Sequence, residues 1–331
     1  MVNLNDIALQ LVAKGKGILA ADESNSSADK RLALYGIAVG EAMRLQDRTL
    51  FLGTEGLEKY LTGVILYEET LGQNNTDGLS FPQSLLKRGI IPGIKVDQGL
   101  EPFPESPEES ITKGLIGLGD RLRVFVDNHQ TGFTKWRAVI KIDGTRLPTS
   151  TAIVENCKRL AMYAVEVQKA GMVPMLEPEV LLEGTHSRLR SQEVLTQVLH
   201  VLVAQLEDQA VDMTGVIVKT AMAISGKESG KKDTPEEVAE STVAALMETI
   251  PAAVPGIVFL SGGQETEEAT ENLRAIVKLA RERKAPWTLT FSYARALQDE
   301  ALTIWAGKEE NVPKAREAFL SRLDKVSEAL G

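Results

Sequence analysis

Cysteine and histidine, the side chains that build disulfides and most zinc sites, are nearly missing from this sequence. Its 331 residues include one cysteine, Cys157, and three histidines. A single cysteine cannot form an internal disulfide, which is typical of a reducing compartment and predicts a cytoplasmic protein. Because Cys157 lies in an apolar helical stretch, we expect it to pack in the core rather than act as a nucleophile.

Positive charge and long apolar runs are also scarce. The chain has 37 lysines and arginines against 46 aspartates and glutamates, a net charge of −9, which argues against a general surface for nucleic acids or anionic membranes. No stretch approaches the roughly 20 apolar residues that span a bilayer, and the first residues lack the basic segment and apolar core of a secretion signal. We therefore expect neither nucleic acids nor membranes as partners.

Short apolar runs recur along the chain instead, with amphipathic helical patterns between most of them. Eight runs have the length and composition of strands buried on both faces. They are residues 15–22, 63–67, 90–97, 135–142, 172–179, 215–220, 256–261 and 287–292. Eight strands with crossovers predict an α/β fold, a single-domain (β/α)8 TIM barrel over residues 1–331. The competing doubly wound sheet usually has a glycine-rich loop after its first strand, and AADESNSSADK (20–30) contains no glycine.

Helices are predicted at both ends of the barrel and between its last strands. NLNDIALQLVAK (3–14) places its apolar residues on one helical stripe, and NVPKAREAFLSRLDKVSEAL (311–330) forms a closing helix. Thr234, followed by Pro235 and two glutamates, has the pattern of a helix start, and another helix follows Thr266.

Charged and polar residues gather where the predicted strands end. They are Asp22, Lys95, Asp97, Glu177, Glu179, Lys219, Ser261 and Arg295. One such residue alone is equally well explained by solvation, but the C-terminal ends of barrel strands meet at one opening, where catalysis occurs. In the fourth strand Lys135, Arg137 and Lys141 also share a face. In an acidic chain, this set of cations and carboxylates predicts a pocket for an anionic ligand.

Lys219 is the most informative of these residues because it ends an apolar strand, 215–220. A partly shielded amine near a second cation, for which Lys135 is the candidate, loses part of its affinity for the proton. Neutral lysine adds to carbonyl groups and forms a Schiff base. The iminium withdraws electrons, so a neighbouring carbon–carbon bond can break to leave an enamine. Glu177 could carry protons during imine formation, and Asp22 could take the proton of a substrate hydroxyl.

A phosphate site is indicated separately by LSGGQETEEA (260–269). Ser261, Gly262 and Gly263 offer a hydroxyl and close backbone N–H groups just before a helix N-terminus. Loops after the seventh and eighth strands are the usual phosphate site of such barrels. Arg295 follows the eighth strand and could complete it.

The stretches KGILAADES, GIKVDQG, KWRAVIKI, VPMLEPE, FLSGGQ and LTFSYARALQ closely resemble the class I, Schiff-base-forming fructose-1,6-bisphosphate aldolases of animals and plants. The resemblance runs from about residue 3 to the final helix. It implies reversible cleavage of fructose 1,6-bisphosphate to dihydroxyacetone phosphate and glyceraldehyde 3-phosphate, in glycolysis, gluconeogenesis or the Calvin cycle. It also implies phosphorylated sugar substrates, no metal or other cofactor, and a homotetramer.

The resemblance assigns roles to individual residues. Lys219 would form the Schiff base, Asp22 would act on the C4 hydroxyl, and Glu177 would be the general acid/base. Glu179, Lys135 and Arg137 would support the imine and the substrate, with Lys141 deeper in the barrel. The residues expected at one phosphate are Ser261, Gly262, Gly263 and Arg295, and those expected near the other are Ser24, Ser27 and Lys95.

Three departures from the family pattern stand out. Thr220 and Ala221 replace a proline and an asparagine after the lysine, and Ala294 replaces a glycine beside the phosphate site. Animal and plant relatives continue into a flexible tail ending in a tyrosine that assists proton exchange on the enamine, whereas this sequence ends at Gly331. These departures concern enamine protonation and the preference between bisphosphate and monophosphate substrates.

Three other functions compete with this interpretation. A metal-dependent aldolase needs several histidine ligands, but His129, His186 and His200 do not end any predicted strand. Sedoheptulose 1,7-bisphosphate shares the dihydroxyacetone-phosphate half of the substrate, and sequence leaves the balance between the two bisphosphates open. A non-catalytic barrel used as a binding scaffold would be expected to have lost the lysine or an acid/base partner, and all of them are present.

Overall fold

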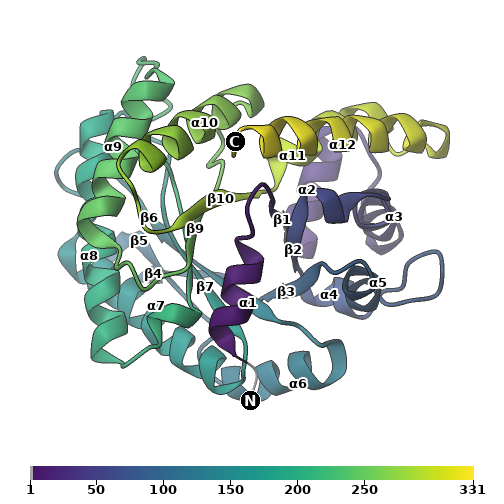
Figure 1. The fold of residues 1–331 in the computed structure, drawn as a ribbon, viewed down its shortest axis with the longest axis horizontal. Coiled ribbons are helices and arrows are strands. Elements are labelled where there is room, and N and C mark those ends of the chain that lie inside the picture. Colours follow the sequence, from purple (N-terminus) through teal and green to yellow (C-terminus); the bar gives the residue numbers. More distant parts are fainter. Residues whose placement is uncertain (1–2) are drawn as a thin grey trace.

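A closed barrel of eight parallel strands forms the centre of the computed structural model, which describes residues 3–331 (Figure 1). The barrel strands are β1 (Gly17–Ala21), β2 (Leu61–Leu66), β3 (Ile91–Lys95), β6 (Phe133–Ile140), β7 (Val173–Val180), β8 (Ile217–Thr220), β9 (Gly256–Phe259) and β10 (Thr288–Tyr293). Their order around the barrel is β1-β10-β9-β8-β7-β6-β3-β2. The predicted (β/α)8 fold is confirmed, and each of the eight predicted runs overlaps one of these strands.

Helices surround the barrel (Figure 1). They are α1 (Leu4–Leu11), α2 (Asn25–Leu34), α3 (Glu41–Leu52), α4 (Glu68–Leu71), α5 (Phe81–Lys87), α6 (Leu118–His129), α7 (Ser150–Lys169), α8 (Arg188–Asp208), α9 (Pro235–Thr249), α10 (Thr266–Glu282), α11 (Arg295–Trp305) and α12 (Val312–Glu328), with 3-10 turns at Leu57–Lys59, Met213–Gly215 and Glu309–Asn311. The predicted start of α9 is confirmed: the Thr234 hydroxyl accepts from the Glu237 N–H, and the Glu237 carboxylate accepts from the Thr234 N–H.

A two-stranded antiparallel sheet, β4 (Leu100–Phe103) and β5 (Ser106–Thr112), was not predicted. Its sequence mixes polar residues with prolines, so it lacks the continuous apolar run of a buried strand. The hairpin nevertheless supports the barrel, because the Thr112 hydroxyl donates to the Arg137 carbonyl over 2.8 Å.

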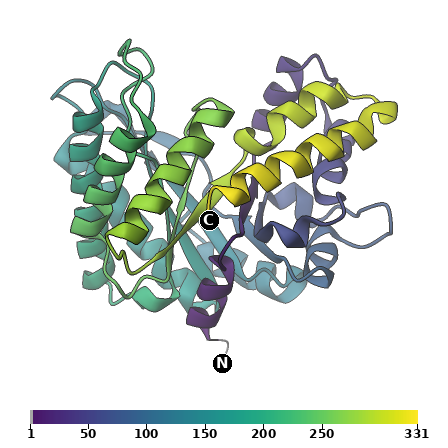
Figure 2. The same cartoon turned by 45° about the horizontal axis from the view of Figure 1, so that its top comes forward.

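Apolar side chains fill the N-terminal part of the barrel, and α1 closes that end (Figure 2). This inner cluster consists of Ala8, Leu11, Val12, Ile18, Ala20, Ile65, Phe133, Val173, Met175, Ile217 and Val258. Alternate residues of a strand point to the same side, so Ile217 is followed inward by Lys219, and Met175 by Glu177. Along each of these two strands the inward side chains therefore change from apolar to charged. The layer of charged side chains, which we call the charged level, lies directly above the apolar cluster.

Helix α12 packs against α3 and also holds the starts of α10 and α11, two helices that follow the barrel strands β9 and β10. Phe319 packs edge-on against Phe51 at 4.9 Å between ring centroids. On the same buried face, the Arg322 guanidinium donates to the carbonyls of Thr266 (2.6 Å) and Ala296 (3.2 Å). Because Thr266 begins α10 and Ala296 lies in the first turn of α11, Arg322 fixes the two helix starts relative to each other.

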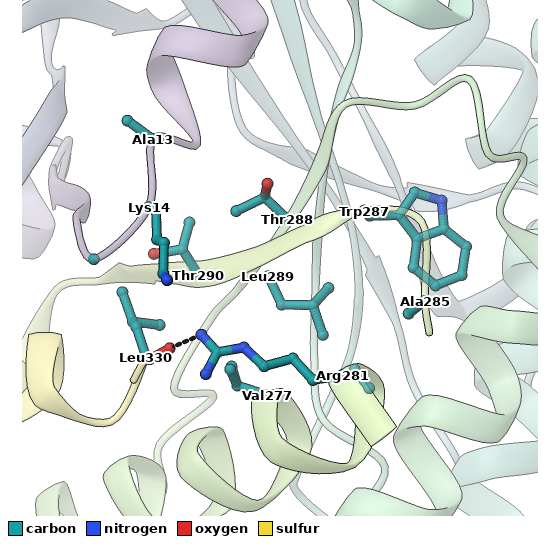
Figure 3. Close-up of a pocket in the computed structure, with 12 residues that line it drawn as sticks. Ala13, Lys14, Val277, Arg281, Ala285, Trp287, Thr288, Leu289, Thr290 and Leu330 are labelled. Carbon is teal, nitrogen blue, oxygen red and sulfur yellow. Dashed lines mark hydrogen bonds between the residues drawn. The ribbon is translucent and has the colours of Figure 1, made fainter. Parts of the chain in front are cut away.

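A small cavity of about 220 Å³ lies between α10, the start of β10 and the loop that follows α1 (Figure 3). Lys14, Trp287 and Leu289 line it, and Arg281 donates to the main-chain carbonyls of Leu330 and Gly331. These two hydrogen bonds attach residues 330 and 331 to α10. Since the lining includes the first residues of β10, the cavity lies away from the charged level.

Two further expectations concern single features. Cys157 is buried in α7, and burial raises the pKa of its thiol to about 12, so the prediction that it packs is confirmed. Within residues 3–331, every helix is too short or too polar to cross a membrane.

Candidate active site

Four charged side chains form a continuous chain of contacts inside the barrel opening. Lys135 Nζ lies 2.6 Å from Asp22 Oδ2 and 2.9 Å from Glu177 Oε2, and Lys219 Nζ lies 2.9 Å from Glu177 Oε1. Asp22, Lys135, Glu177 and Lys219 are only 3–8% exposed. Charged side chains are buried in proteins when opposite charges compensate them. Here two ammonium groups alternate with two carboxylates.

Strand register brings these residues to one level. Leu176 on β7 pairs with Val218 on β8, so the following residues, Glu177 and Lys219, are neighbours. Asp22 comes directly after β1, which is not adjacent to β6 in the barrel. The ion pair between Lys135 and Asp22 therefore crosses the interior.

The charges of this cluster depend on one another. Burial alone would raise the pKa of Glu177, but Lys135 and Lys219 outweigh it and lower that pKa to about 2. Burial would lower the pKa of Lys135, but Asp22 and Glu177 raise it above the usual lysine range. At neutral pH Glu177 is therefore a carboxylate and Lys135 an ammonium, and the carboxylate of Glu177 lies between the two lysines.

A cleft of about 700 Å³ opens beside this cluster, and several predicted binding residues line it. Its lining includes Asp22, Ser24, Ser27, Lys95, Lys135 and Arg137. Lys95 Nζ lies 2.5 Å from Asp97 Oδ1, and Arg137 pairs with Glu179. Burial lowers the pKa of Arg137, but Glu179 and further carboxylates raise it overall. The cleft is thus lined by lysines and arginines together with the carboxylates that pair with them.

Ser24 is held by the start of α2. It is the N-cap residue, and its hydroxyl accepts from the Ser27 N–H at 3.3 Å and lies 3.0 Å from the Ser27 hydroxyl. Capping fixes the chain direction directly after Asp22. Both residues line the cleft, as does Lys95.

The loop Ser261–Gly263 lies between β9 and α10. Gly262 and Gly263 have φ angles of +60° and +87°, which favour glycine over other residues. No acceptor among residues 3–331 takes the N–H groups of Ser261, Gly262 or Gly263. A Cβ atom on Gly263 would lie 3.4 Å from Arg295 Nη2, so this guanidinium adjoins the loop. Free N–H groups beside an exposed arginine are suited to binding an anion.

One predicted position is wrong. Lys141 does not lie deeper in the barrel: it is exposed and follows Ile140, the last residue of β6. The family resemblance implies a deeper Lys141, and a period of two puts it on the face of Lys135 and Arg137, but this period does not apply beyond Ile140, where β6 ends. The Glu177 carboxylate contacts both Lys135 and Lys219 and so connects the two ammonium groups. That Lys135 lowers the proton affinity of Lys219 stays a prediction.

The three histidines lie apart from the cluster. His129 ends α6, His200 lies on α8, and His186 lies between β7 and α8. Burial lowers the pKa of both His129 and His186. Among residues 3–331, no group of three histidine, cysteine or acidic side chains has an arrangement able to hold a metal ion.

Two polar residues near the opening were not predicted. Ser292 is 1% exposed, and its hydroxyl has no partner among the described residues. Tyr293 donates outward to the Ala269 carbonyl, so alternation directs Ser292 into the barrel, and the pattern TLTFSY could have shown this. Arg31 on α2 binds Glu23, which lines the cleft, and Asp299 on α11. These partners are far apart in sequence, so no local pattern indicates them.

Comparisons with known proteins agree over nearly the whole chain. The family model for glycolytic fructose-bisphosphate aldolase class-I matches residues 3–331. Fructose-bisphosphate aldolase 6, cytosolic, of Arabidopsis thaliana is 48% identical over 95% of this chain and 87% of its own length. The cytoplasmic isozyme of fructose-bisphosphate aldolase from Spinacia oleracea is 46% identical over 97% of this chain and 89% of its own length. The solved structure of fructose-bisphosphate aldolase from Plasmodium falciparum, in complex with TRAP and a small-molecule inhibitor, is 43% identical, with a TM-score of 0.95 over 99% of this chain and 93% of that one.

Proposed function

Because the chain belongs to the class I fructose-bisphosphate aldolases, we propose that Lys219 is the residue that forms the imine with the substrate. The enzyme is a carbon–carbon lyase that cleaves fructose 1,6-bisphosphate reversibly into dihydroxyacetone phosphate and glyceraldehyde 3-phosphate. The observation that carries the proposal is the buried contact of 2.9 Å between Lys219 Nζ and Glu177 Oε1. The names of the relatives give no support to sedoheptulose bisphosphate as the main substrate or to a non-catalytic barrel.

Imine formation begins with a proton transfer inside the cluster. Glu177 is ionised at rest and its Oε1 lies 2.9 Å from Lys219 Nζ, so it is the acceptor within reach when Lys219 gives up its proton and becomes a neutral amine. The amine adds to the C2 carbonyl, and the resulting carbinolamine loses its hydroxyl as water after taking the proton back from Glu177. Lys219 then carries the iminium. The Glu177 carboxylate lies within hydrogen-bond distance of Lys219, which allows both halves of this exchange.

Cleavage of the C3–C4 bond follows from the iminium. Asp22 accepts the proton of the C4 hydroxyl, C4 becomes the aldehyde carbon, and the electron pair of the broken bond moves into the iminium to give an enamine. Protonation at C3 and hydrolysis release dihydroxyacetone phosphate and regenerate the amine. Lys135 stays positive beside Asp22 at 2.6 Å and compensates the carboxylate charges as they change.

The two ends of the opening supply the phosphate sites. The free N–H groups of Ser261–Gly263 and the Arg295 guanidinium would bind one phosphate. Ser24, Ser27 and Lys95 would contact the other, and Arg137 with Glu179 would orient the sugar hydroxyls. Lys141 has no part in this proposal.

We also propose properties of the whole enzyme. Residues 1–331 act as one catalytic domain, catalysis needs no metal, and the enzyme works in the cytoplasm as a homotetramer. The cytosolic names of the plant relatives support the location, and the alternating lysines and carboxylates support chemistry without a metal.

Reductive trapping tests the central assignment. Borohydride added with dihydroxyacetone phosphate reduces the iminium to a stable amine, so mass spectrometry should find the adduct on the peptide that carries Lys219. Lys219→Met keeps similar length and apolar bulk and should abolish labelling while the fold survives. An adduct on Lys135, Lys95 or Lys141 would assign the imine to a different lysine.

A further inference from the structure

The side-chain amide of Gln264 forms a hydrogen bond with the proposed phosphate loop, Ser261–Gly263. The Gln264 Nε2 group donates to the Ser261 carbonyl over 2.9 Å, and the Gln264 backbone N–H donates to the same carbonyl over 3.0 Å. This carbonyl is thus bonded twice. While this carbonyl is held by Gln264, the N–H groups of Ser261, Gly262 and Gly263 have no acceptor among residues 3–331.

The orientation of this amide is fixed by a buried partner. Asn272 on α10 donates from Nδ2 to Gln264 Oε1 over 2.7 Å. Because the Ser261 carbonyl can only accept, the Gln264 nitrogen must face it, and the oxygen must face Asn272. Asn272 is 1% exposed, and its own Oδ1 has no partner among the described residues. A buried acceptor without a partner lowers stability, so asparagine at this position serves something other than packing.

Gln264 also lies next to the segment that follows Lys219. Its Nε2 is 3.6 Å from Met222 Sδ, and the Leu260 N–H donates to the Thr220 carbonyl over 3.0 Å. The loop is therefore attached to the strand that carries the imine lysine as well as to α10. A shift of Gln264 would change the distance between the phosphate loop and Lys219.

We propose that Gln264 is a positioning residue for phosphate binding, and that Asn272 fixes its amide. The pair keeps the Ser261–Gly263 loop in the conformation that directs its N–H groups at the substrate phosphate, at a set distance from Lys219. This rests on the proposed function of that loop. Neither residue touches the substrate in this arrangement, so both act on binding of the phosphorylated substrate and not on imine chemistry.

The test separates binding from catalysis in the full-length enzyme. Gln264→Ala should raise the KM for fructose 1,6-bisphosphate and the inhibition constant of inorganic phosphate together, by about three- to tenfold, the value of one hydrogen bond. The kcat should stay within about twofold. Gln264→Glu keeps the side-chain size but cannot donate to Ser261, so it should raise both constants at least as much. Gln10→Ala, which removes an exposed amide from α1, is the matched control and should change neither.

Asn272→Leu distinguishes positioning from a structural role. It removes the partnerless acceptor, so the melting temperature should stay equal or rise, while KM and the phosphate inhibition constant should rise about two- to threefold. An unchanged KM in both Gln264 variants overturns the proposal, and an unchanged KM in Asn272→Leu alone overturns the role of Asn272. Borohydride trapping of unphosphorylated dihydroxyacetone on Lys219 should be equal in all variants. Failure of trapping in the wild-type enzyme would instead refute the imine assignment.

Discussion

Lys219 and Glu177 form a buried ion pair of 2.9 Å on neighbouring strands, and Glu177 also contacts Lys135. One carboxylate therefore serves two ammonium groups. This sharing explains how an apolar strand can end in a charged amine: the charge is compensated inside the barrel, and the proton of Lys219 has an acceptor within hydrogen-bond distance.

Lys219→Met should nearly abolish cleavage while preserving the fold. Methionine has similar length, and Glu177 keeps Lys135 as a partner, so the buried carboxylate is not left alone. Losing the nucleophile removes the covalent route, and kcat should fall by at least about four orders of magnitude, as for other lost catalytic nucleophiles. Steady-state cleavage assays and circular dichroism measure the two effects. Residual activity near that of the wild type would assign the nucleophile elsewhere.

Lys135→Met should damage both stability and catalysis. It removes the cation between Asp22 and Glu177, and loss of one partner of a buried pair typically costs about 3–5 kcal/mol. Because Lys135 is one of the two lysines that lower the pKa of Glu177, the acid limb of the pH–rate profile should move to higher pH. Urea unfolding and kcat across pH values test this. Lys141→Met, on an exposed residue, is the control and should leave both unchanged.

Acid should destabilise the fold through Glu177. Its pKa is lowered from 4.5 to about 2 in the folded state, so ionised Glu177 stabilises the fold above pH 4.5. This stabilisation is lost as the pH falls from about 4.5 to about 2, and it amounts to up to roughly 3 kcal/mol. Urea unfolding at several pH values should show a shallower decline for Glu177→Gln in this interval. Equal slopes for the two proteins would contradict the ionised state of Glu177.

Much of the barrel could be predicted because each strand or helix start is indicated by a few consecutive residues. Each apolar run gave one strand, and the pattern at Thr234 gave the start of α9. Period two along one strand also placed Lys135 and Arg137 on the cleft. The same rule failed at Lys141 because the sequence does not show where β6 ends.

Relations across the barrel could not be predicted. Nothing near Lys135 in sequence indicates its ion pair with Asp22, since the two elements are not adjacent even in the sheet. Arg31 was missed for the same reason, because its partner Asp299 comes from the other end of the chain. The β4–β5 hairpin was missed because polar residues and prolines interrupt its apolar residues.

Arg295→Ala should mainly weaken substrate binding. The guanidinium adjoins Gly263 and is exposed, with no acidic partner among the described residues, so its charge is available to a phosphate. A charge-assisted contact contributes about 1.5–3 kcal/mol, which corresponds to a KM increase of roughly 10- to 150-fold. Arg274→Ala, on the exposed face of α10, is the control. An unchanged KM for the bisphosphate would place the phosphate elsewhere.

Excess EDTA should leave the activity unchanged. A metal-dependent aldolase polarises the carbonyl with a Lewis acid, whereas the proposed iminium on Lys219 would provide the same electron withdrawal covalently. The carboxylates nearest the reaction, Asp22 and Glu177, already have lysine amines at 2.6–2.9 Å. A divalent cation would have to displace these ammonium groups and would meet like charge from both lysines. Cleavage should therefore proceed at the same rate after dialysis against chelator, with borohydride inactivation in the presence of dihydroxyacetone phosphate also unchanged. Loss of activity that added zinc restores, together with loss of borohydride sensitivity, would contradict the Schiff-base route.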